Sequence, residues 1–274
     1  MRSRSWAPVV RGTRLVRAGG DERLKGFMSF DYQSVAGDYQ YRALHSGPRM
    51  QRFWHGGKLA VIDRLIRPHL TKGARTLEIG CGAGNLLLRA AVRGSFPVAL
   101  DLAMPSLSFV RSRLETRLQG VDPPAGFGCV QAVSEALPLA DGTFDCVLLS
   151  EVLEHLKEPY ETVCEAVRVL TPGGRLFVTT PNYRSLWPFM EWAVDRLKLT
   201  PKMAGEQHIS AFKPLALRQL LITVGLEIEY FGTIYGVSPF LSLVSADWAH
   251  RRLSQELTRR SPYGMILVAV ARRP

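Results

Sequence analysis

The chain has 274 residues, of which 46% are hydrophobic and 22% charged, and this mixture excludes a wholly disordered or fibrous protein. The net charge of +11 is unevenly distributed. Residues 1–72 hold 14 basic and 5 acidic residues and residues 250–274 hold 6 basic and 1 acidic residue, whereas residues 73–249 carry a net charge of −3. The basic ends favour peripheral contact with an anionic membrane or with nucleic acid, but such ends also serve solubility alone.

Four cysteines are present, and no two of them form a C-x-x-C pair. Their spacing fits neither a zinc site nor a disulfide scaffold, so the sequence favours a reducing compartment. No uninterrupted apolar stretch reaches the ~20 residues that a transmembrane helix needs. We therefore expect a cytoplasmic protein without a transmembrane segment, in contact with a membrane surface at most peripherally.

Three regions follow one another along the chain. Residues 1–27 are rich in Arg and Gly and are predicted to form a disordered basic arm. Residues 28–72 are predicted to form a cap that ends in a helix over residues 52–70, where apolar residues recur at helical spacing. Residues 73–274 are predicted to form one domain with insertions near residues 183–213 and 232–262.

From residue 74 onward, short apolar runs alternate with amphipathic stretches. The predicted strands cover residues 76–79, 96–100, 128–132, 144–149, 175–180, 226–231 and 265–271. The predicted helices begin at residue 85, cover residues 106–118, 186–197 and 214–224, and include one that ends at residue 170. This alternation predicts an α/β fold, in which a parallel sheet carries helices on both faces.

A glycine turn follows the first of these strands. Gly80, Gly82 and Gly84 form a G-x-G-x-G pattern, and Asn85 stands where a dinucleotide fingerprint would have its last glycine. Glycines suit a tight turn in which a ligand touches the backbone. Asp101 ends the next strand, 21 residues after Gly80, where its carboxylate can accept two hydrogen bonds from a ribose diol. The pattern predicts a nucleoside site.

These motifs resemble the class I S-adenosylmethionine-dependent methyltransferases. The resemblance implies a three-layer Rossmann-like fold with a seven-stranded sheet, the last strand antiparallel, and S-adenosylmethionine as cofactor. Glu78 and Gly80 would lie near its methionine moiety. Val133 stands where the family often has an adenine-contacting Asp, so adenine recognition would rest on apolar contact and on backbone groups near Ser134. The cofactor-binding residues implied are Glu78, Gly80, Cys81, Gly82, Gly84, Asp101, Leu102, Val133, Ser134 and Ser150.

A Glu-x-x-Glu-His motif follows the fourth strand of this domain. Glu151, Glu154 and His155 are spaced i, i+3 and i+4, which predicts one shared helix face, and His208 follows further along the chain. This combination resembles the ubiquinone-biosynthesis O-methyltransferases and the small-RNA 3′-end 2′-O-methyltransferases. The resemblance implies that all four residues bind a divalent cation (Mg²⁺, Mn²⁺ or Zn²⁺), with His155 and His208 as catalytic residues. Similar Glu-His turns also shape the pocket in members of the family that bind no metal.

The expected reaction moves a methyl group to a hydroxyl, which is a poor nucleophile at pH 7 and needs a base or a metal. We expect O-methylation of a small-molecule acceptor of phenolic or lipid-like character. RNA 2′-O-methylation is the alternative within this class, and a non-catalytic interaction protein that binds S-adenosylmethionine is the alternative from another class. An aromatic segment in the first insertion either covers an apolar acceptor or packs in the core: Trp187, Phe189, Met190 and Trp192.

Overall fold

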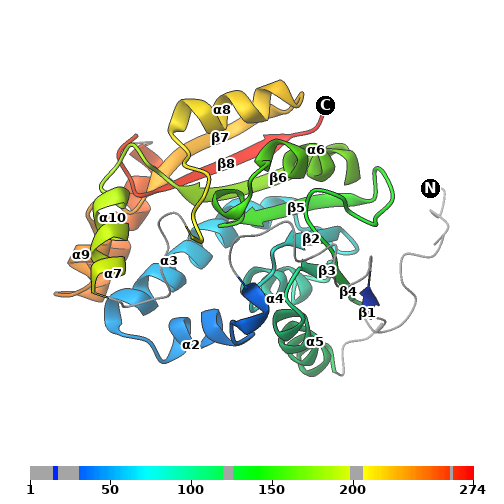
Figure 1. Cartoon of the computed structure of the whole chain (residues 1–274), viewed down its shortest axis with the longest axis horizontal. Helices are drawn as coiled ribbons and strands as arrows, with labels where there is room; N and C mark the ends of the chain where they lie inside the picture. Colours follow the sequence, from blue (N-terminus) through cyan, green and yellow to red (C-terminus); the bar gives the residue numbers. More distant parts are fainter. Residues whose placement is uncertain (1–14, 18–30, 120–125, 198–205, 260–261) are drawn as a thin grey trace.

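Eight strands form one sheet in the order β1-β4-β3-β2-β5-β6-β8-β7 in the computed structural model, which describes residues 15–17, 31–119, 126–197, 206–259 and 262–274 (Figure 1). The strands are β1 (Leu15–Arg17), β2 (Arg75–Ile79), β3 (Phe96–Asp101), β4 (Gly128–Gln131), β5 (Phe144–Ser150), β6 (Leu170–Pro181), β7 (Glu227–Ile234) and β8 (Ile266–Arg272). The α-helices are α2 (Tyr39–His45), α3 (Arg49–Ile66), α4 (Asn85–Ala91), α5 (Met104–Leu118), α6 (Pro159–Val169), α7 (Trp187–Arg196), α8 (Pro214–Thr223), α9 (Ser238–Leu241) and α10 (Ala246–Arg259). Short 3-10 turns are η1 (Tyr32–Ser34), η2 (Arg67–His69) and η3 (Leu153–His155).

The seven strands β2 to β8 confirm the predicted sheet. Strands β2 to β6 pair in parallel, and β8 is antiparallel to both of its neighbours, β6 and β7. The parallel strands therefore end at one edge of the sheet, where ligands of open α/β sheets bind. The short β1 was not predicted: its three residues pair with β4 at the outer edge, although the sequence places them in a disordered arm. The other residues of that arm lie outside the described ranges.

Helices cover both faces of the sheet, as predicted (Figure 1). Alternation along the strands decides which side chains face which layer. On β2, Leu77 and Ile79 pack in a core shared with α6 and α8, whereas Glu78 points to the opposite face. On β5, Cys146 and Leu148 pack on that opposite face in a core shared with α3 and α4. Each strand thus contributes to two cores, which accounts for the nearly continuous burial of β2 and β5.

The cap and the two insertions flank the carboxyl edge of the parallel strands. Helix α3 begins at Arg49, three residues before the predicted start, and gives way to η2 at Arg67, since Pro68 cannot continue an α-helix. The first insertion carries α7 and the second carries α9 and α10, whose residues pack with α3 and β8. Among the described residues, no helix has both the length and the apolar character needed to cross a membrane.

Candidate active site

The glycine turn after β2 adopts the left-handed backbone that its glycines permit. Gly80 has a φ of +66° and Gly84 a φ of +67°. A Cβ atom added to Gly80 would lie 2.6 Å from Cγ2 of Val152, and one added to Gly84 would lie 2.8 Å from Cγ2 of Val110. The turn is therefore closed to larger residues at both positions by backbone strain and by neighbouring side chains. It leads directly into α4, and its N–H groups bond within the protein: that of Cys81 donates to Leu100, that of Gly82 to Asp101 and that of Gly84 to Cys81.

Asp101 connects this turn to β3. One carboxylate oxygen accepts a hydrogen bond of 2.9 Å from the N–H of Gly82, and the other accepts one of 2.8 Å from the N–H of Ala103. Burial raises the pKa of Asp101, and the N–H groups of Ala103 and Gly82 oppose that rise. The N–H of Leu102 and the Cys81 thiol also oppose the rise, so the carboxylate holds the turn and β3 together.

A cavity of about 50 Å³ lies against the glycine turn and is lined in part by three residues that we did not predict, Gln40, His55 and Lys58. They come from α2 and α3, and they face Glu78, Gly80, Cys81 and Ser150 across the cavity. Burial raises the pKa of Glu78 to about 8, and burial together with Lys58 lowers the pKa of His55 to about 4. The cap thus contributes polar groups to the predicted cofactor site.

The other predicted cofactor residues lie along the same edge. The carbonyl oxygen of Leu102 accepts hydrogen bonds from the side-chain amides of Gln33 and Gln131. Val133 and Ser134 follow β4; Val133 is half-buried, and the buried Ser134 hydroxyl accepts a hydrogen bond from Thr162.

Two predicted cofactor residues that line the cavity, Ser150 and Cys81, have side chains that interact within the protein. Ser150 ends β5, and its hydroxyl lies 3.0 Å from the hydroxyl of Thr179. Burial keeps the pKa of Cys81 well above its usual value, so this thiol stays protonated and serves as a packing residue.

The predicted helix over the Glu-x-x-Glu-His motif is wrong. The N–H of Glu151 continues the sheet by donating to the carbonyl of Thr179, and the chain then turns sharply, with Glu151 at a φ of +57°. Only Leu153–His155 form a single 3-10 turn, so Glu151 does not share a face with the other two residues. Its Oε2 lies 3.3 Å from Nζ of Lys58, and its Oε1 is buried with no hydrogen-bond partner in the described part of the chain.

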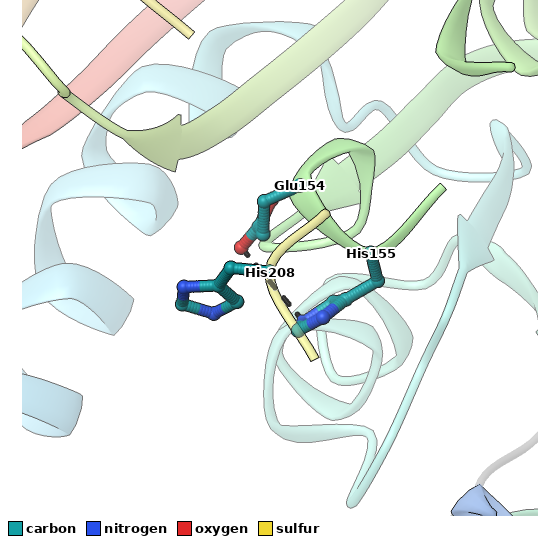
Figure 2. A group of neighbouring side chains, drawn as sticks. All are labelled: Glu154, His155 and His208. Carbon is teal, nitrogen blue, oxygen red and sulfur yellow. Dashed lines mark ion pairs between the residues drawn. The ribbon is translucent and has the colours of Figure 1, made fainter. Parts of the chain in front are cut away.

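Glu154, His155 and His208 do come together. One ligand atom of each lies within 4.8 Å of the others, and Figure 2 shows the carboxylate and the two rings converging. Glu154 is buried and its pKa is raised, first by that burial and second by Glu151. His155 is half-buried: its pKa falls to about 4, because loss of solvation and then His208 disfavour the charged ring.

Each member of this cluster is held by another polar group. The Nδ1 atom of His155 lies 2.8 Å from the carbonyl oxygen of Gln207, and Oε2 of Glu154 accepts a hydrogen bond of 3.0 Å from Thr180. The Nδ1 atom of His208 lies 2.5 Å from Oε1 of Glu191. Carbonyl and carboxylate oxygens only accept hydrogen bonds, so each ring carries a proton on Nδ1, and in the neutral form of the ring the lone pair is then on Nε2. Oriented side chains of this kind suit a metal site or a catalytic base.

Aromatic side chains surround the cluster. The Tyr32 hydroxyl lies 2.9 Å from Nδ1 of His155, and the ring of Trp187 lies 5.9 Å from that of His208. Of the four aromatic and apolar residues of the first insertion, Trp187 and Met190 are partly buried against the core, whereas Phe189 and Trp192 are exposed. Packing in the core therefore applies to Trp187 and Met190, whereas covering of an acceptor by Phe189 and Trp192 stays a prediction.

Glu191, next to His208, is a further residue that was not predicted from the sequence. A signal was present, because it is the single acid in an otherwise apolar run from Leu186 to Val194. An acid at such a position needs a buried partner, but the sequence does not say which one.

Comparison with known proteins agrees with this geometry. The family described as "Methyltransferase domain" matches residues 77–178. A ubiquinone biosynthesis O-methyltransferase from Xylella fastidiosa is 32% identical over 216 residues, which cover 74% of this chain and 85% of that protein. One from Xanthomonas axonopodis pathovar citri is 36% identical over 176 residues, covering 63% and 69% respectively.

Among solved structures, an S-adenosylmethionine-dependent methyltransferase from Mesorhizobium loti has the same fold. It aligns with a TM-score of 0.55 at 21% identity, over 77% of this chain and 96% of that one. The solved structure supports the fold alone. The sequence relatives support the family as well, because one of them is similar to this chain over most of its own length. The chain therefore belongs to the class I S-adenosylmethionine-dependent methyltransferases.

Proposed function

We propose that this enzyme transfers the methyl group of S-adenosylmethionine to a hydroxyl of a small phenolic or lipid-like molecule. The observation that carries the proposal is the pair of histidines, His155 and His208, that both keep an Nε2 lone pair beside the cofactor edge of the sheet. Relatives named ubiquinone biosynthesis O-methyltransferase support a hydroxyl acceptor. A hydroxyl needs such a base, whereas an unprotonated amine does not.

On this proposal the cofactor lies across the glycine turn. Asp101 accepts hydrogen bonds from the ribose diol, and Val133 and Ser134 flank the adenine beside Leu102. The methionine moiety enters the cavity between Glu78, Gly80, Cys81 and Ser150. Gln40, His55 and Lys58 line the same cavity and join the binding residues.

The reaction is an in-line displacement at the methyl carbon. The acceptor oxygen forms a bond to this carbon while the carbon–sulfur bond breaks. The electron pair of the broken bond stays on sulfur and neutralises the sulfonium charge. The proton of the hydroxyl passes to Nε2 of His208 or of His155. Holding the oxygen ~3–3.5 Å from the methyl group, in line with the breaking bond, supplies most of the acceleration.

A divalent cation fits the cluster as a second part of the proposal. Glu154, His155 and His208 offer one oxygen and two imidazole nitrogens, a set that suits Zn²⁺ or Mn²⁺ better than Mg²⁺, which prefers oxygen. A bound cation would lower the pKa of the acceptor hydroxyl and would replace the histidine base, because a ring nitrogen that ligates the cation cannot accept the proton. Titration calorimetry with Zn²⁺ and Mn²⁺ tests this: one site per chain is expected, weakened at least tenfold by Glu154→Gln. Equal affinity in the two proteins would contradict the cation site.

The proposed activity is tested with methyl-labelled S-adenosylmethionine and a set of matched acceptors. An ortho-dihydroxybenzene should gain label, and its dimethyl ether, which lacks a free hydroxyl, should not. Label in an oligoribonucleotide with a terminal 2′-hydroxyl, absent from the 2′-deoxy version, would instead support RNA methylation. Cofactor binding without transfer to any acceptor in whole-cell extract would support a non-catalytic protein.

We also propose peripheral contact with an anionic membrane. Exposed apolar side chains gather on and beside α9 and α10, among them Leu243, Val244 and Trp248, and the exposed Arg251 follows on the same helix. Apolar insertion combined with positive charge favours anionic lipid. Cosedimentation with vesicles of anionic lipid should exceed that with neutral vesicles and should decrease in Trp248→Ala. Equal cosedimentation with both lipids would contradict the proposal, and preferential binding of RNA would favour a nucleic-acid partner.

A further inference from the structure

Helix α7 is attached to the protein in an unusual way. Its one fully buried residue is an acid, Glu191, whereas Phe189 and Trp192 are 63% and 59% exposed. An amphipathic helix is normally held by apolar side chains on its inner face. Trp187 and Met190 pack partly against the core, and because burying a carboxylate without partners is strongly unfavourable, the position of α7 also depends on the groups that Glu191 meets.

Those groups belong to the catalytic side of the enzyme. Oε1 of Glu191 lies 2.5 Å from Nδ1 of His208, and the Tyr183 hydroxyl donates to the same carboxylate at 2.9 and 3.1 Å. The side chains of His208 and Glu191 are 7% and 5% exposed. Tyr183 follows β6 and Glu191 belongs to α7, so two separate segments fix the ring.

The two histidines of the cluster differ in what holds them. Nδ1 of His155 faces a neutral carbonyl, that of Gln207, and shares this position with the Tyr32 hydroxyl. Nδ1 of His208 faces a carboxylate, and hydrogen bonds to ionised acceptors are shorter and stronger than neutral ones. A carboxylate on one nitrogen fixes the tautomer and the orientation of an imidazole, and the lone pair then stays on the other nitrogen.

We propose that Glu191 is the positioning residue for His208. It holds the proton on Nδ1 and directs the Nε2 lone pair toward the acceptor hydroxyl, and Tyr183 keeps the carboxylate in place. The inference rests on the proposed function, because His208 acts on a hydroxyl there. Because Phe189, Glu191 and Trp192 all lie on α7, a shift of this helix at its exposed surface would also move the carboxylate that holds the His208 ring.

The test compares Glu191→Ala with Glu191→Gln, because a Gln oxygen can still accept from Nδ1 whereas Ala leaves the nitrogen without a partner. Removing a group that orients a catalytic or ligating His typically costs 10–100-fold. We expect kcat to fall by that factor in Glu191→Ala, with the KM for S-adenosylmethionine changed less than twofold, and we expect Glu191→Gln to recover most of the loss. Tyr183→Phe removes a group that holds the carboxylate and that also lies 3.5 Å from Nδ1 of His208, so its loss should be intermediate and smaller than that of Glu191→Ala.

A readout that needs no acceptor accompanies the kinetics. The ¹⁵N chemical shifts of the His208 ring distinguish the two neutral tautomers. They should show the Nδ1–H form in the wild type and in Glu191→Gln, and a mixture in Glu191→Ala. An unchanged tautomer in Glu191→Ala, or equal losses in the Ala and Gln variants together with a raised cofactor KM, would overturn the role of Glu191. The proposed function fails separately, if His208→Ala leaves methyl transfer unchanged while the wild-type ring still shows the Nδ1–H tautomer.

Discussion

The proposed cofactor side and the proposed acceptor side of this site differ in which parts of the chain form them. On the proposed cofactor side, the backbone turn and the carboxylate of Asp101 lie within a short stretch from Glu78 to Asp101, to which the cap adds Gln40, His55 and Lys58. The proposed acceptor side is formed by side chains from segments far apart in sequence. Tyr32 and His155, for example, are in contact although they are 123 residues apart. A site formed by one local backbone turn can be predicted from a sequence motif, whereas a site formed by side chains distant in sequence depends on how the elements pack.

The comparison predicts that variants of the two sides separate turnover from cofactor affinity. The largest effect is expected for His208→Ala, because removal of a general base typically lowers turnover ~10²–10⁴-fold. The affinity for S-adenosylmethionine should stay within twofold, since His208 does not line the cavity beside the glycine turn. Single-turnover rates and titration calorimetry on the same protein measure the two quantities.

His155→Ala serves as the comparison for that variant. Burial lowers the pKa of His155 to about 4, so its ring is a weak base, and its loss should reduce turnover less than the loss of His208. A larger loss in His155→Ala than in His208→Ala would reverse the assignment of the base. Comparable losses of turnover and of cofactor affinity in His208→Ala would remove the distinction between the two sides.

On the cofactor side, the expected effect is smaller and appears in binding. Asp101→Ala should weaken S-adenosylmethionine binding about tenfold or more, because hydrogen bonds to a charged group contribute ~1.5–3 kcal/mol each. Part of this loss can come from the turn itself, since Asp101 also accepts from the N–H of Gly82. A cofactor analogue with a 2′,3′-dideoxyribose separates the two contributions.

The wild type should discriminate against that analogue, and Asp101→Ala should bind both forms with nearly equal affinity. This is a double-mutant cycle in which one of the two changes is made in the ligand. If Asp101→Ala kept the full discrimination, the ribose would be recognised by other residues, and Asp101 would only organise the turn.

The same contrast explains which features could be predicted from the sequence. The strands β2 and β3 and the start of α4 were found within one residue, because apolar alternation and the glycine turn are local signals. The helix over Glu151 was wrong because helical spacing does not reveal that the sheet continues to this residue, whose N–H bonds to Thr179. Local periodicity therefore fails where a long-range hydrogen bond decides the backbone.

The remaining site residues could not be predicted from the sequence, because tertiary packing brings them to the site. Gln40 and Lys58 reach the cavity only because the cap docks against the glycine turn, and nothing in their local sequence marks them. Glu191 carried a signal, an acid within an apolar helix, but His208 as its partner is fixed by tertiary packing. The chain from Leu15 to Arg17 joins the sheet at β4 through backbone pairing, which its Arg-rich composition does not indicate.

A different kind of effect is expected in the pH dependence of stability, and it comes from Glu78. Burial raises its pKa to about 8 in the folded protein, above the ordinary value of 4.5. Between these values the folded state keeps a proton that the unfolded state has lost, so the free energy of unfolding falls as pH rises. The stabilisation is fully present below about pH 4.5 and is lost on passing pH 8, with a slope of at most ~1.4 kcal/mol per pH unit. Urea unfolding of wild type and Glu78→Gln should measure it, because the amide keeps an oxygen that accepts from the N–H of Leu87 but does not titrate. The wild type should lose stability relative to the variant from about pH 5 to 8, and parallel curves would show that Glu78 is ionised in the cofactor-free protein.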